Sequence, residues 1–138
     1  MAKYNSQLIQ ALRHTSSRLS SGAKYEWGHM GRCNCGHLVQ TVTKMNDREI
    51  VQVVNHRMDE WSEHAKAYCA HTGHEASLIF DTMEQMGFSY EDMVHLEYLS
   101  DPKVLNRLGH NTYLQHNQVE HVILYMQEMA SMLEEEIF

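Results

Sequence analysis

The chain has 138 residues, of which 43% are hydrophobic and 21% are charged, and its formal net charge is −7. This length suits one domain with its own core, and this composition excludes an intrinsically disordered chain. The acidic balance argues against nucleic acid or an anionic membrane surface as the main partner, because both attract a basic face. We therefore expect a single helical domain over residues 1–138.

The cysteines and the N-terminus favour the cytoplasm. Cys33, Cys35 and Cys69 are odd in number, and only one residue separates the first two, so a disulfide framework is not expected. No apolar stretch is long enough for a transmembrane helix, and the first residues lack the apolar core of a signal peptide. A reducing cytoplasm is the expected compartment.

Hydrophobic residues recur at helical spacing along most of the chain, whereas the alternation typical of strands is weak. The first helix is expected from about Ser6 to Leu19, with Asn5 as its N-cap. Residues 20–34 contain three glycines and predict one long ordered loop. The aromatic residues in it, Tyr25 and Trp27, are expected to pack against the core and hold the loop in place.

The next two helices have clear start signals. The second is expected to begin near Cys35, with Asn34 as its N-cap. Asn46, followed three residues later by Glu49, has the pattern of a capping box and predicts the start of a third helix. The apolar stripe of that helix continues to about His71.

Four further signals divide the second half of the chain into helices. They are Thr72–Glu75, which opens a helix that ends at Gly87, Ser89–Asp92, Asp101-Pro102 with a stop at Gly109, and a last start near Asn117 with Glu120 three residues later. The fold class is therefore all-α, a compact, bundle-like array of about five to seven helices.

One segment carries several potential metal ligands. His29, Cys33, Cys35 and His37 lie close together where the glycine-rich loop is expected to enter a helix. Thiolate and imidazole groups suit zinc and other transition metals. Our leading hypothesis is a transition-metal site, zinc more than iron, built on Cys33, Cys35 and His37.

The spacing of these ligands calls for a second source. Structural zinc sites usually take cysteines two to four residues apart, in pairs from two separate segments. Here all four candidates come from one loop, so His29 and a residue from the region 64–74 would complete the site. The best candidates in that region are His71 and His74.

Two alternatives remain open. If Cys35 lies at a helix N-terminus, the helix dipole would lower its pKa, and the chain would be a thiol-dependent enzyme or a redox sensor centred on Cys35. Alternatively, the cysteines are merely buried, and the chain is a helical interaction or scaffold protein. The methionines of the last helix, Met126, Met129 and Met132, would then form either core or the interface of a homodimer. No small-molecule ligand follows from either alternative.

Overall fold

The computed structural model describes residues 5–53, 61, 65, 77–109 and 113–136. Within these residues it forms seven helices and no strand, which confirms the predicted all-α array. The helices are α1 (Ser6–Ser20), α2 (Asn34–Thr43), α3 (Asp47–Val53), α5 (Ser77–Gln85), α6 (Tyr90–Tyr98), α7 (Pro102–Leu108) and α8 (Val119–Glu135).

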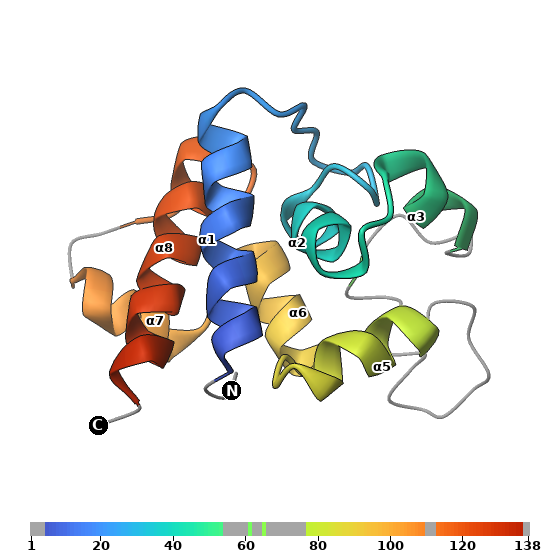
Figure 1. Cartoon of the computed structure of the whole chain (residues 1–138). Helices are drawn as coiled ribbons and strands as arrows, with labels where there is room; N and C mark the ends of the chain where they lie inside the picture. The colour runs from blue at the N-terminus through green and yellow to red at the C-terminus, as the bar shows by residue number, and fades with distance from the viewer. Residues whose placement is uncertain (1–4, 54–60, 62–64, 66–76, 110–112, 137–138) are drawn as a thin grey trace.

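Helix α1 packs along α8, and the two run antiparallel side by side (Figure 1). Helix α7 flanks α8, while α2 packs against α1, α3, α5 and α6. The loop of residues 21–33 leads from the end of α1 to the start of α2. None of the described helices combines the length and hydropathy that a membrane-spanning segment requires.

The first helix forms as the sequence predicts. The Asn5 side chain accepts hydrogen bonds from the backbone N–H groups of Gln7 and Leu8, which would otherwise lack partners at the helix start. One face of α1 packs into the core, since four residues at helical spacing are all buried: Leu8, Leu12, Thr15 and Leu19. Thr15 is tolerated there because its hydroxyl donates to the Ala11 carbonyl at 2.7 Å.

The capping boxes that the sequence predicts before α3 and α6 are both present in the structure. Asn46 and Glu49 exchange two hydrogen bonds between side chain and backbone before α3. Ser89 and Asp92 do the same before α6. Asp101 caps α7, whose first residue is a proline that needs no hydrogen-bond partner for its nitrogen.

The predicted N-cap of the second helix is wrong by one residue. The N-cap of α2 is Cys33, and Asn34 is the first helical residue. The Asn34 side chain does not cap its own helix because it bonds to distant segments instead. The last helix starts near Asn117, as predicted: its N-cap is Gln118, which follows a turn in which Gln118 N donates to the Gln115 carbonyl.

Part of the predicted pattern lies outside the described residues. This applies to most of the stripe after α3 and to the start signal at Thr72–Glu75. Trp61 and Ala65, which are described, are helical and buried, as that stripe requires. The predicted stop after α5 is confirmed, because Gly87 takes a left-handed backbone with φ 85°.

The methionines of α8 belong to the core. Met126, Met129 and Met132 are 0%, 0% and 7% exposed, respectively. Of the two predicted uses of this stripe, core packing is the one that the fold adopts. Unbranched methionine side chains fill gaps between helices that meet at different angles.

Two glycines allow the loop, α2 and α3 to approach closely. A Cβ atom on Gly36 would collide with the Met30 carbonyl oxygen, and one on Gly31 would lie 2.5 Å from the Asp47 carbonyl oxygen. In both cases the obstacle is backbone, which cannot turn aside as a side chain can. The loop therefore lies directly against the first turn of α2 at Gly36 and directly against the start of α3 at Gly31.

We expect Gly36→Ala to lower the free energy of unfolding by about 3 kcal/mol, because the added methyl group forces backbone apart in a packed region. The matched control is Gly22→Ala. Gly22 has φ 94° but open space around it, so only backbone strain of about 1 kcal/mol is expected. Urea unfolding of both variants measures the difference, and equal losses would contradict the close contact at Gly36.

Candidate functional site

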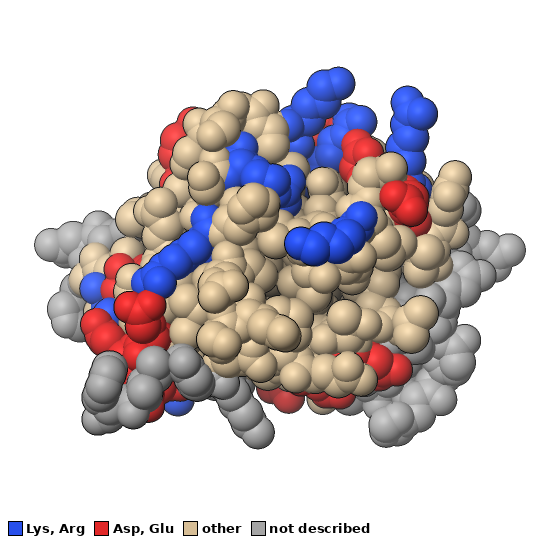
Figure 2. All heavy atoms as spheres, viewed as in Figure 1, with Lys and Arg blue, Asp and Glu red and all other residues tan. Residues whose placement is uncertain are grey.

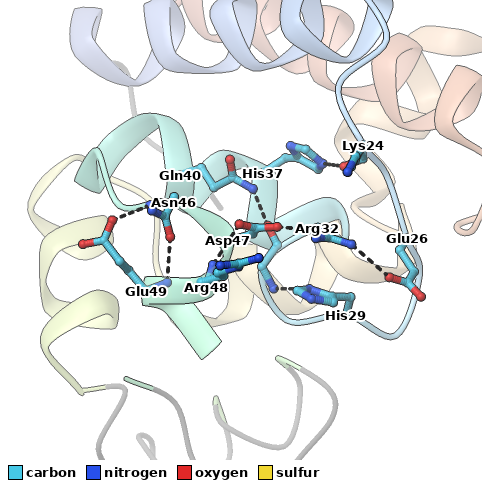
Figure 3. Close-up of polar contacts among 11 residues, drawn as sticks. Lys24, Glu26, His29, Arg32, His37, Gln40, Asn46, Asp47, Arg48 and Glu49 are labelled. Carbon is cyan, nitrogen blue, oxygen red and sulfur yellow. Dashed lines mark hydrogen bonds and ion pairs between the residues drawn. The ribbon is translucent and has the colours of Figure 1, made fainter. Parts of the chain in front are cut away.

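The loop of residues 21–33 is held against α2 and α3 by polar contacts (Figure 3). Arg32 Nε donates to Asp47 Oδ2 at 2.6 Å, and Arg32 NH1 lies 3.6 Å from Glu26 Oε2. The Gln40 side chain of α2 donates to the Gly31 carbonyl at 2.5 Å. The hydrogen bond from Arg32 lowers the pKa of Asp47 below its ordinary value. The ordered loop that the sequence predicts is thus present.

Aromatic side chains of the same loop contact α2, α6 and the segment before α8. The Tyr25 hydroxyl donates to Asn34 Oδ1 at 2.6 Å. The Trp27 ring lies 4.5 Å from the ring of His116 and 6.1 Å from that of Tyr98. An isolated histidine such as His116 would ordinarily be expected at the surface. Here it is half-buried in a cluster of three rings.

Both described cysteines are inside the core. Cys33 and Cys35 are 2% and 1% exposed, and both are free thiols. Cys33 Sγ lies 3.6 Å from Glu97 Oε2 and 3.8 Å from the Met30 carbonyl oxygen. Cys35 Sγ donates to the Met93 carbonyl oxygen at 2.9 Å. Each thiol therefore faces an internal acceptor, away from solvent.

This environment opposes the formation of thiolate. Burial raises the pKa of both thiols well above the ordinary value, and the nearby Glu97 carboxyl group raises it further. The backbone N–H of Gly36, at the start of α2, favours the thiolate of Cys33, but desolvation is the larger effect. The start of a helix is therefore not enough to make these cysteines reactive.

His37 is buried and held by its neighbours. It is 2% exposed, and its Nε2 lies 2.7 Å from the Lys24 carbonyl oxygen. Because a carbonyl only accepts, Nε2 carries the proton in the neutral ring. Its Nδ1 is buried and has no hydrogen-bond partner in the described part of the chain. Burial lowers the pKa of His37, so the neutral form is favoured.

The predicted metal ligands do not converge in the described structure. The side chains of Cys33, Cys35 and His37 each face a different carbonyl group, and His29 Nδ1 accepts a hydrogen bond from the Gly31 N–H at 3.1 Å. Within the described ranges, no group of three His, Cys, Asp or Glu side chains could hold a metal ion. The other two predicted ligands, His71 and His74, lie outside those ranges. The zinc site has no support from the described residues and stays a prediction.

Asn34 is the central polar residue of this region. Its Nδ2 lies 3.1 Å and 2.9 Å from the Leu96 and Glu97 carbonyl oxygens at the end of α6, and 3.0 Å from the carbonyl oxygen of His116. Its Oδ1 accepts from Tyr25. One fully buried amide thus joins the loop, α2, α6 and the segment before α8.

Sequence reasoning missed two further residues of this region. Glu97 is only 2% exposed and lies beside both thiols. Its position four residues after Met93 placed it on the buried stripe of α6, and this spacing was the available signal. Arg18 of α1 donates to both the His37 carbonyl and the Thr41 hydroxyl at 2.8 Å. No local pattern marks that contact, because it joins two helices.

Comparisons with protein-family models, curated proteins and solved structures find no match to this chain. Its function has to follow from its own geometry.

We expect Asn34→Asp to destabilise the protein by about 3 kcal/mol or more. The carboxylate would face three carbonyl oxygens where the amide donates, and a buried charge would be added. Asn5→Asp is the matched control, because the Asn5 side chain only accepts hydrogen bonds and Asp is an equally good N-cap. Thermal unfolding distinguishes the two variants, and a neutral effect at Asn34 would refute its central role.

We also expect stability to fall as the pH drops below about 6.5, the ordinary pKa of histidine. The folded state keeps His37 neutral, while the unfolded chain takes up a proton, so protons favour unfolding. The loss of stability should grow as the pH falls from about 6.5, because each step favours the protonated, unfolded chain more. His37→Gln should flatten the pH dependence, and His14→Gln, at an exposed position of α1, is the control for the removal of a surface histidine. A wild-type slope in His37→Gln would show that another group is responsible.

Proposed function

We propose that this chain is a helical binding module, and that its Cys/His segment, residues 29–37, stabilises the fold and performs no thiol chemistry. The observation that carries the proposal is the burial of Cys33 and Cys35, whose thiols face internal acceptors and are raised in pKa. A reactive thiol needs exposure, a lowered pKa and a base in reach. The environment of Cys35 supplies the opposite of the first two conditions.

The histidine of the segment supports the same proposal. A general base must have a ring nitrogen available to the group from which it takes a proton. His37 Nε2 is hydrogen-bonded to the Lys24 carbonyl oxygen, and Nδ1 is buried and not accessible to solvent. Its low exposure and lowered pKa fit a packing residue. The side chain of His37 therefore has the environment of a buried structural residue and not that of a general base.

Polar contacts also join α1 to α2, the helix on which the Cys/His segment ends. Arg18 of α1 donates to the His37 carbonyl and the Thr41 hydroxyl of α2. Thr41 Oγ1 also lies 2.7 Å from Thr15 Oγ1 on α1. These contacts give the surface formed by the two helices a defined shape, which a binding module needs in order to be preorganised.

The cytoplasmic location and the homodimer remain part of this proposal. The methionines of α8 are buried, so they no longer argue for an interface on that helix. Leu124 of α8 is 41% exposed and is the remaining apolar feature there. Sedimentation velocity of the full chain, with Leu124→Glu as a variant, tests a dimer through α8.

We expect Cys33 and Cys35 to react with iodoacetamide at least about 100-fold more slowly in the folded protein than in urea, because reaction requires opening of the core. Peptide mass spectrometry assigns the rate to each cysteine. Ser17→Cys, at an exposed position of α1, is the control for an accessible thiol and should react at the unfolded rate. Fast, selective reaction of Cys35 near neutral pH would contradict the proposal and favour the thiol enzyme or redox sensor.

The same assay separates the proposal from the zinc hypothesis. If a metal held the thiols, a chelator would accelerate their alkylation. Elemental analysis of untagged protein would then show about one equivalent of zinc or iron, lost in a Cys33→Ser/Cys35→Ser variant. For buried structural thiols we expect slow alkylation with and without the chelator.

A further inference from the structure

A hollow lies on the surface where α1, α2 and the end of α5 meet. Its volume is about 670 Å³, within the range of ligand-binding clefts. The lining comes from three places in the chain: Gln7, Gln10, Ala11, Arg13 and His14 on α1, Thr41, Val42 and Lys44 at the end of α2, and Met86 after α5. Its shape depends on the Arg18 and Thr41 contacts between α1 and α2.

The hollow has an apolar floor and a polar rim. Ala11, Val42 and Met86 are buried or half-buried, while Gln7, Gln10, Arg13, His14 and Lys44 are exposed. This arrangement suits an amphipathic segment, with apolar side chains on the floor and polar ones at the edge.

The charge of the hollow is opposite to that of the chain. The whole sequence has 18 acidic and 11 basic residues, yet none of the residues that line the hollow is acidic. Figure 2 shows the side of the molecule on which α1 lies in front in Figure 1: Lys and Arg side chains lie across its middle and at its upper right, where Asp and Glu side chains lie among them, and other Asp and Glu side chains lie toward the lower edge. Within the described part of the chain, neither His14 nor Lys44 makes an ion pair, and Arg13 makes one exposed pair, with Glu134 at 2.6 Å.

Lys44 places a positive charge at the edge of the hollow, at the end of α2. It follows α2 in the left-handed conformation, with φ 65°, where glycine would be relaxed and a lysine is strained. The hydrogen bond that closes the helix, from Lys44 N to the Gln40 carbonyl, needs no side chain. Leu99 ends α6 with the same left-handed backbone, so the angle at Lys44 belongs to the helix end, and only the position of the Lys44 side chain bears on the hollow. That side chain lines the hollow.

We propose that this hollow binds an acidic, amphipathic segment of a partner protein. Its apolar side chains lie on Ala11, Val42 and Met86, and its carboxylates lie at the rim beside Lys44 and His14, which make no ion pair within the described part of the chain. The inference rests on the proposed function as a binding module and names the class of partner. A second copy fits less well, because the acidic end of α8 is engaged within the chain: Glu134 pairs with Arg13 and Glu135 with Arg107.

The test uses the full chain and a phage-displayed library of random peptides of about 12 residues. We expect the enriched peptides to carry net negative charge and at least two apolar residues, and to bind with micromolar affinity in fluorescence anisotropy. Enrichment of neutral or basic peptides, or no enrichment, would overturn the proposal. Self-association that Val42→Asp abolishes would instead assign the hollow to a second copy, and would also overturn it.

Lys44 and Lys103 give a matched pair of charge reversals. Lys44→Glu should weaken binding of the selected peptide by about 10-fold or more, because it places a like charge at the rim. Lys103→Glu, at an exposed position on α7 outside the hollow, should change it less than about 2-fold. Equal effects of the two variants would overturn the proposal.

Lys44→Gly separates binding from folding. Glycine relieves the left-handed strain, so the thermal unfolding temperature should stay the same or rise, while peptide affinity falls. Unchanged affinity would show that the Lys44 side chain is not part of the site. The alkylation rates of Cys33 and Cys35 test the proposed function separately from the proposed partner. If both thiols react slowly but no acidic peptide binds, only the acidic partner is rejected.

Discussion

The buried amide of Asn34 is the interaction on which the arrangement around α2 depends. It joins four segments that lie far apart in the sequence or in different elements: the loop of residues 21–33, α2, the end of α6 and the segment before α8. The carbonyl oxygens at the end of a helix lack partners within that helix, and burying them without a donor is costly. Asn34 supplies the donor for two such carbonyls of α6, so α2 and α6 can pack together with their polar ends enclosed.

The chemistry of the neighbouring cysteines follows from the same constraint. Cys33 and Cys35 flank the amide in sequence and fill the space around it, where a larger side chain would separate α2 from α6. A thiol is a weak donor that tolerates an apolar environment. Here each thiol meets an acceptor, Glu97 or a backbone carbonyl, without needing water. Both cysteines thus fill the space beside one asparagine without exposure to solvent.

Local signals in the sequence predicted the helix starts well, because the groups that satisfy a helix end are only a few residues away. Asn5, the pair Asn46 and Glu49, and the pair Ser89 and Asp92 are examples. The role of Asn34 could not be predicted in this way, since its acceptors lie 62 to 82 residues further along the chain. Spacing alone also could not reveal that Cys33, Cys35 and His37 face different carbonyl groups.

The distribution of charge affects binding differently at long and short range. The net charge of −7 repels an acidic partner at a distance, but salt screens this repulsion beyond about 8 Å at physiological ionic strength. Several acids are also neutralised within the chain, as where Arg107 bridges Glu128 and Glu135. The side chains of the hollow act only at contact. A partner would therefore gain little from electrostatic steering, and its selectivity would lie in its dissociation rate, determined by the fit to the floor and rim.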